Sequence, residues 1–171
     1  MRYALALAIA LVAGSVSTTA SAHLLPKQHA TMRIVDNSAF FVVAVPASAL
    51  HDIDDDSDGL ISPREVQRHE QYIVRQFARG FHVESFDTEQ EDAATWLTLP
   101  HTDNAASASD YLVVLHRVDF AETPRNPTVE INLFGADAGE DRYAFRASSG
   151  PTVENVILAP ESPVFTFFTA S

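Results

Sequence analysis

The sequence predicts a mainly β fold, an antiparallel β-sandwich with one helix and one inserted loop. Eight or so short segments are either apolar throughout or alternate apolar with polar side chains, and Gly, Pro, Asn and Asp separate them. A single longer segment repeats its apolar residues at helical spacing. Two packed sheets fit this pattern, with an immunoglobulin-like topology as one form. The alternative is an open antiparallel sheet with the helix across one face.

The first two strands are predicted at residues 30–35 and 39–45, on either side of a turn at 36–38. Pro46 ends the second strand, because proline lacks the backbone N–H that a sheet ladder needs. These segments form a hairpin at the start of the domain.

The helix is predicted at residues 63–79. Pro63 favours a helix start and Gly80 a helix end. Charged and polar side chains take one side of this segment, so its other side must pack on something apolar. That apolar stripe consists of Val66, Ile73, Phe77 and Phe81.

The second half of the chain supplies the remaining strands. An acidic loop is predicted at 84–92, a flexible loop rich in Ala and Ser at 102–110, and a turn at 135–141. The segment 111–118 is apolar on both faces, which indicates a central strand. The predicted strands are 95–99, 111–118, 128–134, 143–147, 153–158 and 164–168.

Residues 1–22 have the features of a secretory signal peptide. Arg2 precedes an apolar run at 4–12, and the segment ends in Ala20-Ser21-Ala22. The apolar run is shorter than the roughly 20 residues that span a bilayer. Cleavage would leave 149 of the 171 residues as one domain, 23–171. We therefore expect a periplasmic or secreted protein that does not insert into a membrane after cleavage.

The charge and the cysteine content of the chain limit the classes of ligand and partner that it can bind. The chain has 23 acidic residues against 11 Lys and Arg and a net charge of −12, which favours a cation ligand and disfavours nucleic acid and anionic membrane surfaces. No cysteine is present, so disulfides and thiolate metal sites are excluded. An exported protein without disulfides suits the bacterial periplasm or exterior.

The strongest motif is the segment 54–65, DDDSDGLISPRE. Gly59 stands where a calcium loop turns most sharply, and Ile61 is the one inward-facing apolar residue. Oxygen ligands fall at loop positions 1, 3, 5, 7, 9 and 12, which correspond to Asp54, Asp56, Asp58, the carbonyl of Leu60, Ser62 and Glu65. The alternative is a solvated acidic loop without an ion.

This segment resembles the calcium loop of EF-hand proteins, which implies Ca²⁺ as the ligand. The inserted unit would cover about 47–80, with room for only about two helical turns before the loop at 46–53. EF-hands tend to occur in pairs, and the chain contains no second loop of this pattern. The resemblance therefore implies a structural calcium site rather than a calmodulin-like sensor.

Histidine offers a second metal hypothesis. Signal cleavage would free the α-amino group of His23, and an N-terminal amine with an imidazole resembles the copper site of exported copper carriers and polysaccharide oxygenases. Such a site needs another histidine, for which His29, His101 and His116 are candidates. His69 is followed by Glu70, but no second histidine completes an HExxH zinc motif.

Short motifs across the mature chain resemble the exported N-terminal domain of bacterial membrane proteins of the hydrogenase and urease accessory (HupE/UreJ) type. They are Ala22-His23, Leu133-Phe134 and the segment 156–161, followed by an aromatic last strand. The resemblance implies a β-sandwich outside the membrane with metal- or transport-related neighbours. Because no counterpart of that family's transmembrane helices is present, we expect any role in transport to be indirect.

These observations predict an exported calcium-binding protein that acts as a binding or accessory module, with a protein partner at the cell envelope. An enzyme is not expected, because the chain has no GxSxG elbow and no glycine-rich phosphate loop. A copper-binding protein or copper oxygenase at His23 is the alternative.

Overall fold

The structure is a computed structural model that describes residues 26–100 and 107–169, so the predicted signal peptide, His23 and His101 lie outside the described residues. The described part contains one α-helix, α1 (Pro63–Gly80), and one short 3₁₀ helix, η1 (Ala47–Ala49). Its strands are β1 (His29–Val35), β2 (Ser38–Pro46), β3 (Phe81–Ser85), β4 (Gln90–Thr98), β5 (Tyr111–Phe120), β6 (Pro127–Ile131), β7 (Tyr143–Ser149), β8 (Thr152–Leu158) and β9 (Val164–Thr166).

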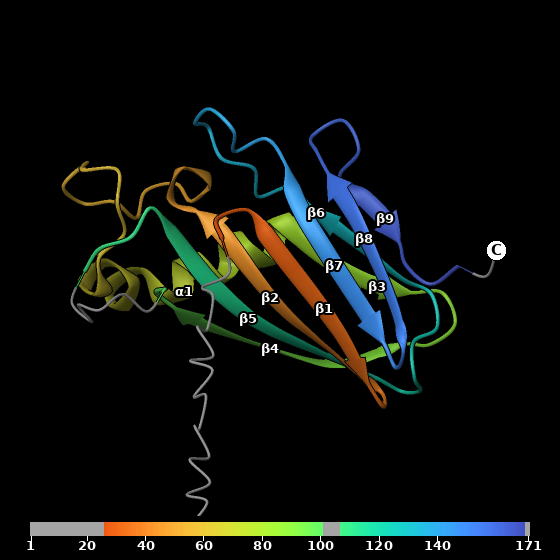
Figure 1. Ribbon diagram of the computed structural model, residues 1–171. Coiled ribbons are helices and arrows are strands. Elements are labelled where there is room, and N and C mark those ends of the chain that lie inside the picture. Colours follow the sequence, from red (N-terminus) through yellow and green to blue (C-terminus); the bar gives the residue numbers. More distant parts are fainter. Residues whose placement is uncertain (1–25, 101–106, 170–171) are drawn as a thin grey trace, which may run out of the picture.

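The strands form two sheets (Figure 1). The larger sheet has six strands in the order β4-β5-β2-β1-β7-β8, and the smaller has the order β3-β6-β9. All neighbouring strands are antiparallel except β1 and β7, which pair in parallel. The predicted mainly β fold with two packed sheets and one helix is confirmed. Immunoglobulin constant domains divide their strands four and three, whereas this domain divides them six and three.

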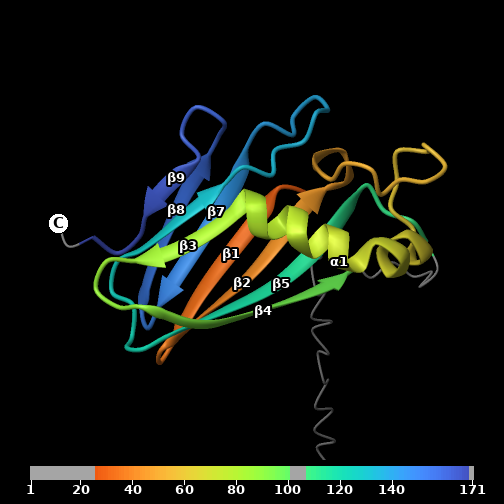
Figure 2. The same ribbon diagram turned by 180° about the vertical axis from the view of Figure 1, so that it is seen from behind.

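Helix α1 and the smaller sheet together cover one face of the six-stranded sheet (Figure 2). The covering layer therefore combines both predicted arrangements, a second sheet and a helix across the first sheet. No described helix is both long enough and apolar enough to cross a membrane. Among the described residues, no helix or second sheet covers the opposite face of the six-stranded sheet (Figure 1).

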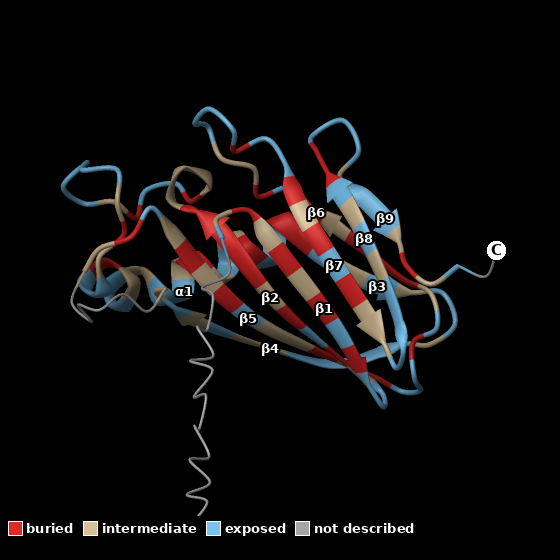
Figure 3. Cartoon of the chain, viewed as in Figure 1, coloured by how far each residue is buried: buried red, intermediate tan, exposed pale blue. Residues whose placement is uncertain are grey.

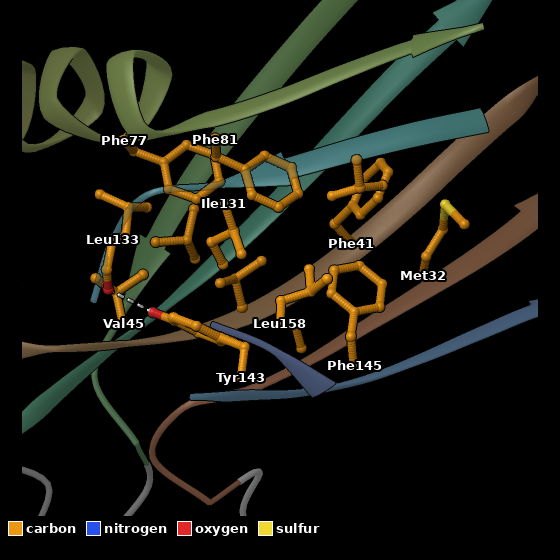
Figure 4. Packing of buried hydrophobic residues seen from close by; sticks show 14 of the residues in the cluster. Met32, Phe41, Val45, Phe77, Phe81, Ile131, Leu133, Tyr143, Phe145 and Leu158 are labelled. Atoms are coloured by element: carbon orange, nitrogen blue, oxygen red, sulfur yellow. Dashed lines mark hydrogen bonds between the residues drawn. The ribbon is translucent and has the colours of Figure 1, made fainter. Parts of the chain in front are cut away.

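The core lies between the two layers. Buried and exposed residues alternate along β1 and β7, because successive side chains of a strand point to opposite faces (Figure 3). Phe77 of α1 stacks on Phe81 of β3, and the Phe81 ring meets Phe41 of β2 edge-on (Figure 4). Tyr143 is fully buried, and its hydroxyl donates to the carbonyl of Leu133 at 2.9 Å, so no polar atom of this ring is left unpaired.

Two predicted boundaries are wrong in the third quarter of the chain. The segment 84–92, predicted as a loop, contains the end of β3 and the start of β4, and the strand predicted at 95–99 extends back to Gln90. Pairing with β6 and β5 provides the backbone partners that the acidic composition concealed. β4 is an edge strand, so its first four side chains, Gln90–Ala93, stay exposed and polar residues are tolerated there.

The apolar stripe of the helix also needs one correction. Phe81 belongs to β3 rather than to α1, but its N–H donates to the carbonyl of Phe77 and its ring is buried. Ile73 and Phe77 are fully buried, and Val66 packs at the edge of the core. The strand predicted at 128–134 ends at Ile131.

Candidate metal centre

The acidic loop lies between η1 and α1, at the end of the domain away from β9 (Figure 1). Its backbone folds around the Asp54 carboxylate, which accepts from the N–H of Gly59 at 2.8 Å and from the N–H of Asp58 at 3.2 Å. Gly59 has a φ of +80°, a backbone conformation that side chains disfavour. The N–H of Leu60 donates to Asp58 at 2.8 Å. The loop is thereby closed by its own acidic side chains.

Asp54, Asp56 and Asp58 converge, and one carboxylate oxygen from each lies within 4.8 Å of the other two. The negative charge of Asp58 raises the pKa of Asp56, and the charge of Glu65 adds to this effect. In contrast, the hydrogen bond from the N–H of Gly59 lowers the pKa of Asp54. Ionised carboxylates at this separation repel one another, and a divalent cation between them would relieve the repulsion.

Glu65 is buried at the start of α1, where it forms a capping box with Ser62. Its Oε1 accepts from the N–H of Asp55 at 2.8 Å and its Oε2 from the N–H of Ser62 at 2.7 Å. These backbone hydrogen bonds, with that of Ser62 first, lower the pKa of Glu65. Each carboxylate oxygen has two acceptor sites, so Glu65 can cap the helix and still offer one site per oxygen to a cation.

Of the six predicted ligands, the structure brings the three aspartates closest together. Glu65 adjoins the three aspartates but is not part of their close cluster. The Ser62 hydroxyl accepts from the N–H of Glu65 at 3.3 Å, so it serves as the helix N-cap in this structure. Leu60 is half-buried. The fit of the site to a cation therefore depends mainly on the three aspartates.

Two features of this region escaped the sequence analysis. Asp55, which the loop pattern leaves without a ligand role, is hydrogen-bonded to His69 at 2.9 Å and paired with Arg68, so it ties the loop to α1. The second is an isolated β-bridge between Ile61 and Ser109, with N–O distances of 2.7 and 3.0 Å. Asp55 could have been noticed because it belongs to the acidic run of the loop. No sequence pattern marks Ser109 as the backbone partner of Ile61.

The structure describes two of the three histidines that the copper hypothesis offers as partners of His23. The ring of His116 faces the core among Phe41, Phe77 and Phe81, and its Nδ1 is 2.9 Å from the Thr95 hydroxyl. His29 lies on the other face of the six-stranded sheet, so these two histidines cannot share an ion.

The fold and the site define a class, a mainly β domain with one inserted acidic loop that closes on itself ahead of a capped helix. Comparison of the chain with protein-family models and with curated proteins found no match.

Proposed function

We propose that this protein is an exported calcium-binding protein, in which one EF-hand-like loop stabilises a β domain that acts as a binding or accessory module at the cell envelope. The observation that carries the proposal is the convergence of Asp54, Asp56 and Asp58 around the turn at Gly59. Carboxylate oxygens are among the ligands that Ca²⁺ prefers.

Glu65 links the ion to the fold. Its carboxylate holds the first turn of α1, where the helix dipole favours a negative charge. A bound cation would draw on the free acceptor sites of the same carboxylate, so binding would also fix the start of the helix. Extracellular calcium modules bind at about 10⁻⁴ to 10⁻³ M, and we expect a single loop without a second EF-hand to fall in this range.

Calorimetric titration of the purified mature protein tests the proposal. Calcium should bind at one site, and Glu65→Gln should weaken binding because an amide offers one carbonyl oxygen in place of two charged oxygens. Glu70→Gln, on the exposed side of the same helix, is the matched control and should bind as the unaltered protein does. The absence of binding heat at millimolar calcium would contradict the proposal.

A copper site at His23 stays a prediction from the sequence. Elemental analysis of protein exported and processed by its own host separates the two metals. One calcium and no copper per chain favours the calcium module, whereas stoichiometric copper that disappears in His23→Ala favours the copper site.

A further inference from the structure

One face of the six-stranded sheet, here called the outer face, is covered by no described helix or sheet and carries exposed apolar side chains on several strands. Strand register places one residue from each of the six strands in a single outward-facing row: Trp96, Leu115, Val42, Thr31, Arg146 and Asn155. On this face Trp96 is 53% exposed, Phe40 44% and Ile157 56%. Trp96 of β4 is the cross-strand neighbour of the exposed Leu115 of β5, and Phe40 of β2 is diagonal to Leu115, whereas Ile157 lies on the opposite edge strand β8. Adjoining exposed apolar side chains are typical of a protein contact.

A hollow of about 450 Å³ lies on the outer face over β1, β7 and β8. It forms because Ala144 is small and stands between two larger neighbours, His29 on β1 and Ile157 on β8. Arg146 and Asn155 bound it on the same face. The hollow falls within the roughly 300–1,000 Å³ of ligand-binding pockets, and its apolar lining with few polar groups is also typical of them. It is large enough to receive a bulky apolar side chain.

The outer face also carries positive charge on an otherwise acidic protein. Arg33 and Arg146 both point outward from neighbouring strands, at positions two residues apart in the register. Neither forms an ion pair with another described residue. Arg117, by contrast, is paired with Asp119 at 3.0 Å. Two unpaired cations side by side favour an anionic partner.

The charges decide between possible occupants. An anionic membrane would meet a chain with a net charge of −12, so its surface would repel most of the protein. A second copy in a two-fold symmetric contact would place its own Arg33 and Arg146 against the same patch, because such an interface uses the same surface twice. A polypeptide segment with acidic and bulky apolar residues meets both requirements.

We propose that the outer face binds an acidic, apolar segment of a partner protein. One bulky side chain of the segment fills the hollow, and its carboxylates pair with Arg33 and Arg146. This contact uses none of the calcium-loop residues, so a failure of calcium binding would not contradict it.

The test starts from a displayed library of random twelve-residue peptides, selected on the calcium-loaded mature protein. Enriched peptides should combine Asp or Glu with bulky apolar residues. The best of them, made synthetically with a fluorescent label, should bind the protein in an anisotropy titration that gives a dissociation constant.

Charge reversal then locates the contact. The double variant Arg33→Glu with Arg146→Glu should bind the peptide at least tenfold more weakly than the unaltered protein. Gln at both positions should reduce the affinity less. Arg125→Glu with Arg142→Glu changes the net charge equally at exposed loop positions and should leave affinity within twofold. The proposal is overturned if no peptide is enriched, or if the two reversed pairs bind alike. Binding to phosphatidylglycerol vesicles without peptide binding, or self-association blocked by the Arg33/Arg146 reversal, would also overturn it.

Discussion

Glu65→Gln should lower stability in two separable ways, because Glu65 caps α1 and is also a predicted calcium ligand. Without calcium, the two carboxylate oxygens accept from the N–H groups of Asp55 and Ser62. A glutamine can accept only one of these bonds, and its own NH₂ would face the other donor. A buried donor left without a partner costs about 1–3 kcal/mol. Because these two hydrogen bonds are part-buried, the free energy of unfolding in chelator should fall by about 1 kcal/mol, the lower end of this range.

Calcium adds the second effect. A ligand that binds only the folded state stabilises it by RT ln(1 + [L]/Kd), about 2.7 kcal/mol at a hundredfold excess over Kd. Urea unfolding of the unaltered protein should show this difference between calcium and chelator, and Glu65→Gln should lose most of it. Glu70→Gln should change neither value.

The two contributions can fail separately. If Glu65→Gln is as stable as the unaltered protein in chelator, the capping box does not contribute to folding. If the calcium-dependent difference survives in the variant, Glu65 is not a ligand.

Three further predictions concern the rest of the domain. Calcium should raise the melting temperature without raising the fluorescence of a hydrophobic dye, and a dye signal that grows with calcium would indicate a sensor-like opening. Burial lowers the pKa of His116 below its ordinary value of 6.5, so the unfolded chain binds the proton first as pH falls. Stability should therefore decline below pH 6.5, by at most about 2 kcal/mol at pH 5, and urea melts of His116→Gln should lack this part of the decline. Gly135→Ala would place a methyl group against the buried carboxylate of Glu140, which pairs with Lys27 at 2.7 Å. Chemical denaturation of Gly135→Ala should show a free energy of unfolding about 1–3 kcal/mol lower than that of the unaltered protein. Unchanged stability would mean that the segment around Gly135 shifts without cost.

Local patterns predicted the elements whose partners are near in sequence or whose side chains repeat regularly. The hairpin of β1 and β2 and the helix from Pro63 were predicted to within a residue or two, because turn residues, proline and apolar spacing all act locally. The close approach of Asp54, Asp56 and Asp58 also agrees with their spacing, since the chain folds back directly after them at Gly59, whose N–H donates to the Asp54 carboxylate.

Features that depend on distant segments were not predictable in this way. The polar strand β4 exists because β5 supplies its hydrogen-bond partners, and the parallel pairing of β1 with β7 joins segments more than a hundred residues apart. The outer face is likewise a product of register, because Arg33 and Arg146 become neighbours only when β1 and β7 align. Periodicity shows which residues share a face of one strand, but not which strand lies beside it.

The bridge between Ile61 and Ser109 attaches the acidic loop to the β domain. Ile61 is fully buried, so its backbone N–H and carbonyl both need partners. The N–H and carbonyl of Ser109 supply them, in the segment that leads into β5. That segment is fixed in turn, because the carbonyl of Asp110 accepts from the N–H of Ala47 at 2.9 Å and its carboxylate pairs with Lys27 at 2.7 Å. The loop is therefore attached to the β domain through its middle and to α1 through Glu65. Since the far end of α1 is anchored in the core by Phe77, an ion bound at the loop would tighten these attachments rather than swing the helix away.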